Sequence, residues 1–147
     1  MTEIYCVIIS LIISTIVSFA TVRITAKSDE RKALHDQLDN ILSIAIEYPY
    51  LEDFFFTQNW QKENLNSQDE NERFKNIRYE NYAIKVFNYI ERYGKFHRWM
   101  PTDIDGEMNV KEWVKVHEKF WDYTNQTEGY CVELNNLIQR YKTNTND

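Results

Sequence analysis

The chain has 147 residues, of which 43% are hydrophobic, 15% aromatic and 27% charged. That length suits one ordinary domain, and three Gly and two Pro are too few turn residues for an all-β fold of this size. The formal net charge of −6 argues against nucleic acid as a ligand, because an acidic surface repels phosphates.

An uncharged apolar segment lies close to the N-terminus. Residues 4–22 read IYCVIISLIISTIVSFATV, without a charge, Gly or Pro. A helix of that length, at about 1.5 Å per residue, spans the ~30 Å hydrocarbon core of a bilayer. Its hydroxyls can donate to backbone carbonyls one turn earlier, so they need no other partner. These hydroxyls belong to Ser10, Ser14, Thr15 and Ser18. We therefore predict that the lipid bilayer is one partner of this chain, bound through residues 4–22.

Two other interpretations of the segment stay open. Ser18-Phe19-Ala20 resembles the cleavage site of a signal peptide, although the N-terminal Met-Thr-Glu has no base and the apolar run exceeds the usual ~15 residues. A buried core helix would show a polar stripe, whereas residues 4–22 are apolar on every face. An uncleaved signal anchor agrees best with both observations.

A basic collar follows the apolar segment and predicts its orientation. Between residues 23 and 32 there are four bases and two acids, whereas the chain from Ala33 onward has 13 bases and 20 acids, a net charge of −7. The collar bases are Arg23, Lys27, Arg31 and Lys32. Since bases beside a span tend to stay in the cytoplasm, we predict a single-pass protein with its N-terminus outside. Residues 1–27 form the anchor with its collar, and residues 28–142 form a cytoplasmic domain.

The remaining sequence predicts an all-α bundle of about four helices. The first helix is continuous with the membrane helix or begins at a Ser28 cap, and it ends before Pro49. Its apolar face packs on the domain itself or mediates self-association; it comprises Leu34, Leu38, Ile41 and Ala45. An aromatic cluster then leads into a polar loop at residues 57–72, and we expect the cluster to pack in the core. Its members are Tyr48, Tyr50, Phe54, Phe55, Phe56 and Trp60.

Three further helices follow. One runs from about Arg73 to Tyr93, with Gly94 as its left-handed C-terminal residue. The next begins at Asn109, which forms a capping box with Glu112. Its face either joins the core or offers a hydrophobic groove to another protein; it comprises Val110, Trp113, Val114, His117, Phe120 and Trp121. After a turn at 125–129, the last face contains Tyr130, Leu134, Leu137, Ile138 and Tyr141, and residues 143–147 form a frayed tail.

Motifs that would carry chemistry are weak in this chain. Residues 101–112 resemble an EF-hand calcium loop at Asp103, Asp105, Gly106 and Glu112. The first position of that loop, however, is Pro101 instead of a carboxylate. A turn before a capped helix is therefore the simpler interpretation. The spacing of metal ligands is absent from the three histidines and the two cysteines of the sequence, which are His35, His97, His117, Cys6 and Cys131. We therefore predict no catalytic, cofactor-binding or metal residues, and two unpaired cysteines suit a reducing compartment.

The overall plan resembles a loosely defined bacterial family of small, uncharacterised proteins with one N-terminal membrane helix and a cytoplasmic helical domain. The resemblance lies in the anchor, the segment 78–91 (RYENYAIKVFNYIE) and the acidic turn into Val110–Trp113. It is architectural and implies no site residues. We expect a membrane-tethered interaction or scaffold module that binds a protein partner or itself. The alternative is a small membrane-anchored hydrolase or ligand sensor, with a site assembled from distant residues such as His97, Glu112 and His117.

Overall fold

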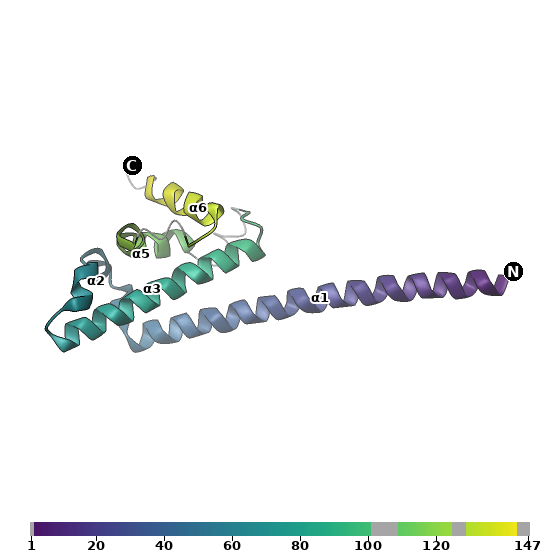
Figure 1. Ribbon diagram of the computed structural model, residues 1–147, viewed down its shortest axis with the longest axis horizontal. Helices are drawn as coiled ribbons and strands as arrows, with labels where there is room; N and C mark the ends of the chain where they lie inside the picture. Colours follow the sequence, from purple (N-terminus) through teal and green to yellow (C-terminus); the bar gives the residue numbers. More distant parts are fainter. Residues whose placement is uncertain (1, 101–108, 125–128, 144–147) are drawn as a thin grey trace. The chain divides into compact units, whose positions relative to one another are not determined.

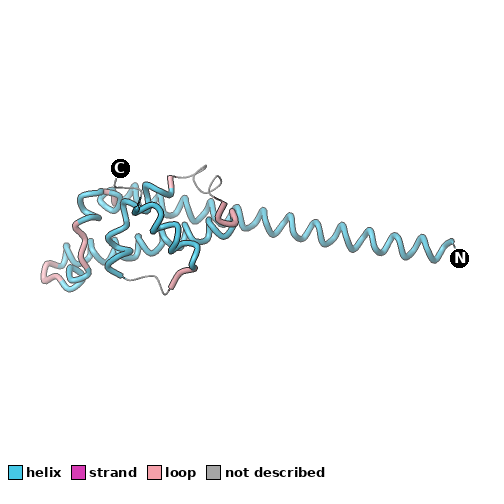
Figure 2. Tube along the Cα trace, turned by 90° about the horizontal axis from the view of Figure 1, so that it is seen from above, coloured by secondary structure: helices cyan, strands magenta, loops and turns pink. Residues whose placement is uncertain are grey.

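The computed structural model describes residues 2–100, 109–124 and 129–143. Over these residues the chain forms helices joined by loops, with no strand (Figure 1, Figure 2). The predicted all-α class is confirmed. The chain divides into two compact units, residues 1–36 and residues 37–147.

The first helix, α1, extends from Thr2 to Glu47 (Figure 1). The alternative start at Ser28 is wrong, because residues 28–30 lie inside this helix. Pro49 ends it as predicted, since the residue before proline is kept out of helical geometry; Tyr48 has φ −128° and ψ 75°. Near the N-terminus, α1 is long and apolar enough to span a membrane.

The apolar part of α1 in the first unit is uncovered. From Tyr5 to Ile24 the exposed large hydrophobic side chains keep 48–71% of their surface accessible. The interpretation as a buried core helix is therefore wrong for the described residues. The hydroxyl of Thr15 donates to the carbonyl of Leu11 at 2.8 Å, as predicted, and Thr21 makes the same bond to Val17 at 2.9 Å.

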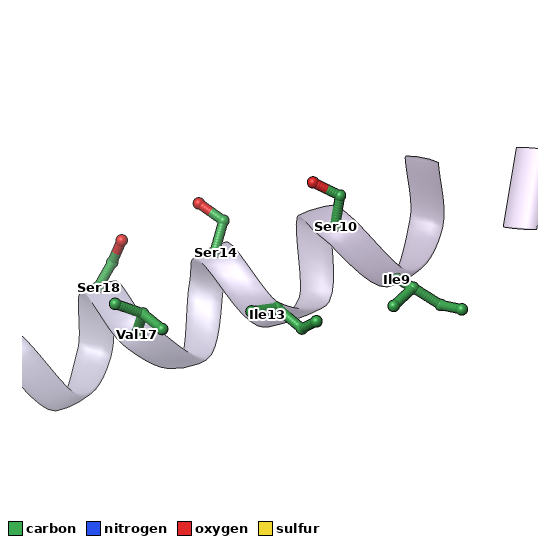
Figure 3. Close-up of a pocket in the computed structure, with 6 residues that line it drawn as sticks. All are labelled: Ile9, Ser10, Ile13, Ser14, Val17 and Ser18. Carbon is green, nitrogen blue, oxygen red and sulfur yellow. The ribbon is translucent and has the colours of Figure 1, made fainter. Parts of the chain in front are cut away.

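Three serines share one side of α1, so the prediction that residues 4–22 are apolar on every face is wrong for this side of the described helix. Figure 3 shows Ser10, Ser14 and Ser18 on the same side of the helix, one turn apart, beside the apolar side chains of Ile9, Ile13 and Val17. These six residues border a shallow surface pocket. It lies on the exposed surface of a single helix, so it is not an enclosed cavity.

The second unit is a helical bundle. Short elements follow α1: the 3-10 helix η1 (Pro49–Glu52), α2 (Phe54–Gln58) and the 3-10 helix η2 (Lys62–Asn66). The longer helices are α3 (Glu70–Phe96), α5 (Val110–Thr124) and α6 (Val132–Thr143). The short helix α2 packs on α5 and η2 packs on α3, while α3, α5 and α6 pack on one another (Figure 1). The end of α1 is bonded to α3, because Asn40 and Gln37 accept hydrogen bonds from Lys85 and Arg92.

The core of this unit consists of the predicted apolar faces. On α5, Val110, Val114, His117, Phe120 and Trp121 are buried as predicted, whereas Trp113 is only half-buried. On α6, Leu134, Leu137, Ile138 and Tyr141 are buried. Aromatic rings fill the space between them and α3: the Trp60 ring centroid lies 5.6 Å from that of Tyr79 and 5.3 Å from that of Phe120.

The predicted polar loop at 57–72 is partly wrong. Within it, residues 62–66 form η2, and α3 begins at Glu70 rather than Arg73. The earlier start follows from Asp69, whose carboxylate accepts the amide hydrogens of Asn71 and Glu72 and so caps the helix. Thr57 and Trp60 are buried, because this segment folds back onto α3 and α5. Polar composition therefore did not imply a solvated loop.

Gly94 does not have the predicted left-handed role. It lies inside α3, and the left-handed residues are Arg98 (φ 53°) and Trp99 (φ 56°). The Trp99 amide donates to the Gly94 carbonyl at 2.8 Å, and the Arg98 amide donates to that of Lys95 at 3.2 Å, which is the Schellman pattern of a helix end. A Cβ at position 94 would lie 2.4 Å from the Trp99 ring. Glycine is thus needed here for close packing.

Candidate functional site

Three polar side chains of the second unit, those of Glu52, Tyr79 and Tyr82, meet around the imidazole of His117. Its imidazole, on α5, is fully buried. Nδ1 lies 3.1 Å from the hydroxyl of Tyr79 on α3, and Nε2 lies 3.4 Å from Oε1 of Glu52 at the end of η1. The hydroxyl of Tyr82 donates to the same Glu52 oxygen. We call these four residues the His117 cluster.

Local structure explains why these four side chains meet. Tyr79 and Tyr82 are three residues apart on α3, so they lie on the same side of that helix. His117 belongs to the buried face of α5. Glu52 follows Leu51, which is fully buried and fixes η1 against the bundle. The cluster therefore joins three elements that are distant in sequence.

One arrangement of protons satisfies the whole cluster. In this arrangement Nε2–H of His117 donates to Glu52 while Nδ1 accepts from Tyr79. Burial, followed by the charge of Glu52, raises the pKa of Tyr79. Burial, followed by the hydrogen bond to Glu52, raises the pKa of Tyr82. Both tyrosines therefore remain protonated donors at neutral pH.

The order tyrosine, histidine, carboxylate resembles a nucleophile, its base and an orienting acid. In this conformation, the burial of the cluster argues against such a catalytic use. Tyr79 and His117 are both fully buried, so a substrate cannot reach the tyrosine hydroxyl, and only Glu52 keeps some side-chain exposure, 28%. In the folded state shown here, the cluster satisfies buried polar groups and holds η1, α3 and α5 together.

The site that was suggested from sequence is not assembled as suggested. His117 contacts Glu52 and Tyr79 instead of His97 and Glu112. Glu112 is exposed at the start of α5 and pairs with Lys115 at 3.2 Å. His97 follows α3, where its ring centroid lies 4.4 Å from that of Tyr93. The third histidine, His35, is exposed on α1 in the first unit.

Sequence analysis missed the partners of His117. Glu52 stands in the short apolar run 51–56, where an acid has to find a donor or solvent. Tyr79 lies on a helical apolar face, and a buried tyrosine hydroxyl usually has a hydrogen-bond partner. Both signals were present, but they did not indicate which residues would meet.

The calcium-loop hypothesis falls largely outside the described residues, because residues 101–108 are not among them. At the end of that stretch, the Asn109 carboxamide accepts the Glu112 amide hydrogen at 3.3 Å, which supports the predicted helix cap. In the part of the chain that the structure describes, no group of three or more His, Cys, Asp or Glu side chains is arranged to hold a metal ion.

A second feature lies on the surface of α2. Phe54 and Phe55 are exposed by 60% and 78%, so the prediction that the whole aromatic cluster packs in the core is wrong for these two rings. The neighbouring Phe56 faces inward, with ring centroids 5.0 Å from Tyr50 and 5.5 Å from Tyr79. Consecutive residues of a helix point about 100° apart, so one side of α2 cannot bury three consecutive phenylalanines.

A hydrogen bond to α5 holds α2 in place. At its start, α2 is capped locally, since Asp53 Oδ1 accepts the amide hydrogen of Phe56 at 2.7 Å. At the end, the Gln58 side chain donates to the Lys115 carbonyl on α5 at 3.0 Å. Phe54 and Phe55 thus form a fixed apolar surface, which we call the Phe54–Phe55 surface.

No protein-family model, curated protein or solved structure matches this chain.

Proposed function

We propose that this protein is a membrane-tethered interaction or scaffold module, such as an accessory subunit of a membrane-associated complex. One observation carries the proposal. The apolar side chains of α1 between Tyr5 and Ile24 are exposed, whereas residues 37–147 enclose an aromatic core of their own. An uncovered apolar helix of this length is satisfied by lipid, and a domain with its own core remains available for partners.

The Phe54–Phe55 surface supports a protein partner. Two adjacent exposed phenylalanines are typical of protein interaction sites, in which aromatic residues, phenylalanine among them, are enriched. Asp53, which is also exposed, is the nearest charged neighbour in sequence. The orientation that we propose places this surface in the cytoplasm, as the basic collar suggests.

The competing hypothesis of a hydrolase or ligand sensor is supported by the His117 cluster alone. Its use in chemistry would require an opening that exposes Tyr79, which is fully buried. The Glu52→Gln variant separates the two hypotheses, because it removes the orienting carboxylate and leaves Phe54 and Phe55 unchanged. Partner binding should persist in this variant if the protein is an interaction module.

Orientation is tested by labelling with a membrane-impermeant thiol reagent. Cys6 and Cys131 are replaced by serine, and Asn144→Cys supplies the single thiol in the C-terminal tail. We expect labelling only after the cells are permeabilised. Labelling in intact cells would contradict a cytoplasmic domain, and release of the protein by alkaline carbonate would contradict the membrane anchor.

Partner binding is tested by affinity purification of the full chain in mild detergent. We expect a stoichiometric partner that is lost in the double variant Phe54→Ser, Phe55→Ser. Val132→Ser is the matched control, because Val132 is another exposed apolar residue, 69% accessible, on α6. Failure to recover a partner, or equal loss with the control variant, would count against an interaction surface on α2.

A further inference from the structure

The basic collar is arranged as a stripe along α1. Arg23, Lys27 and Arg31 follow one another at intervals of four residues, so they lie on neighbouring turns of the same side of the helix. All three side chains are exposed. At ~100° per residue, Asp29 falls on the opposite side, about 160° from the centre of the stripe, whereas Glu30 lies beside the stripe, about 60° from its centre. The stripe therefore concentrates positive charge in a chain that is acidic elsewhere.

Arg23 has a specific position at the start of this stripe. Its guanidinium carbon lies 4.6 Å from the ring centroid of Phe19, one turn earlier. Helical side chains point toward the N-terminus, so the charge of Arg23 reaches back to the last turn of the apolar segment. Among the described residues, no carboxylate lies within ion-pair distance of Arg23 or Arg31.

Distances along the helix place the stripe within reach of lipid headgroups if α1 spans a bilayer through residues 4–22. The Cα atoms of Arg23, Lys27 and Arg31 lie about 1.5, 7.5 and 13.5 Å beyond Val22 along the axis. The headgroup layer is about 6 Å thick on each side, and the Debye length in physiological salt is about 8 Å. The first two bases are therefore in or at the edge of the headgroup layer, and the third lies within one Debye length of it.

We propose that Arg23, Lys27 and Arg31 form a headgroup-binding face that selects anionic phospholipids, with Arg23 binding a lipid phosphate at the hydrocarbon boundary. This inference rests on the proposed membrane anchor. Phe19 holds one face of the Arg23 guanidinium, while the N–H groups along its edge match the bidentate geometry of a phosphate. The anionic leaflet is usually the cytoplasmic one, which agrees with the proposed orientation.

The test uses the full chain, reconstituted in phosphatidylcholine bilayers with traces of spin-labelled lipid. Electron spin resonance measures the fraction of labelled lipid immobilised at the protein, and labelled phosphatidylglycerol is compared with labelled phosphatidylcholine. We expect a preference for phosphatidylglycerol of about fivefold, which corresponds to about 1 kcal/mol, the effect of a single base near an anionic surface. The preference should fall strongly in 1 M salt, where the Debye length is about 3 Å.

Variants assign the preference to the stripe. Arg23→Gln should lower it most, Arg23→Lys should keep part of it because the charge remains without the planar fork, and the triple variant R23Q/K27Q/R31Q should abolish it. The control K62Q/K75Q/K119Q removes the same charge from exposed positions of the second unit and should keep the preference. Inorganic phosphate at constant ionic strength should not compete.

The outcomes separate this inference from the proposed function. Wild-type protein that fails to insert into the bilayers would refute the anchor. Inserted protein without lipid preference, or a preference that the control triple variant abolishes as fully as R23Q/K27Q/R31Q does, would refute the headgroup-binding face alone. Competition by inorganic phosphate would show a site for free anions and would likewise overturn the assignment to lipid.

Discussion

The hydrogen bond between His117 and Tyr79 offers the sharpest test of the packing in the second unit. His117→Leu removes the imidazole, which leaves the Tyr79 hydroxyl buried without its acceptor and Glu52 with Tyr82 as its remaining donor in the cluster. A buried polar group that loses its partner costs about 1–3 kcal/mol. Because Glu52 is part-exposed, water can replace the lost donor there. We therefore expect a loss of about 2–3 kcal/mol in the free energy of unfolding.

A double-mutant cycle isolates the interaction. Tyr79→Phe alone leaves Nδ1 of His117 without its donor and should cost about 1–2 kcal/mol. In the double variant no buried group is orphaned at this contact, so its cost should be smaller than the sum of the single costs by about 1 kcal/mol or more. Tyr123→Phe is the control, because it removes a hydroxyl from a side chain that is 44% exposed.

Urea unfolding of the full chain in detergent, followed by near-ultraviolet circular dichroism, provides the measurement. That signal reports the aromatic core, including Trp60 beside Tyr79. Additive single costs would refute the reasoning, because they would mean that His117 and Tyr79 do not interact. An unchanged stability of His117→Leu would show that the buried imidazole is not needed to satisfy the cluster.

Three other substitutions give independent tests by urea unfolding. Glu91 accepts the Cys131 amide hydrogen at 2.8 Å and pairs with Lys95 at 3.0 Å; burial opposes ionisation, but these donors outweigh it and lower the pKa of Glu91. The contribution of the Glu91 carboxylate to stability is therefore complete above its unfolded-state pKa and is lost as the pH falls through the lowered folded-state pKa. Glu91→Gln should lower the free energy of unfolding by about 1 kcal/mol at pH 7 and by progressively less below about pH 4. A deficit that stays constant down to pH 2 would contradict this role. Gly94→Ala should lower the free energy of unfolding by about 1–3 kcal/mol, since its Cβ would overlap the Trp99 ring. The same substitution should lower it much less in the Trp99→Ala background. Equal losses in both backgrounds would argue against the overlap. The guanidinium carbon of Arg78 lies 3.8 Å from the Tyr48 ring centroid, and the guanidinium donates to the Tyr50 hydroxyl at 3.0 Å. Arg78→Met should therefore lower the free energy of unfolding by about 1–2 kcal/mol, and Arg78→Lys by less. An unchanged stability of Arg78→Met would show that this contact does not hold the 48–50 segment.

The periodic parts of the fold were predictable because their cause is local. An apolar face at 3/4 spacing has to be buried, and this rule alone identifies most of the buried residues of α5 and α6. Pro49 ends α1 for a reason confined to two residues. The length and apolar character of residues 4–22 likewise depend on composition alone, so the helix that can span a membrane is evident from the sequence.

Other features depended on which elements meet. His117 was recognisable as part of an apolar face, but its partners came from η1 and α3, and no local signal pairs residue 117 with residues 52 and 79. Phe54 and Phe55 look like core residues in sequence, and only the packing of α2 on α5 decides that Phe56 is turned inward instead. Gly94 resembled a helix stop, yet its role comes from the ring of Trp99 folding back over it. In each case the sequence determined what a residue requires, whether burial, a hydrogen-bond partner or space. Tertiary packing decided which neighbour provides it, because such contacts join residues that are distant along the chain or turned by a cap.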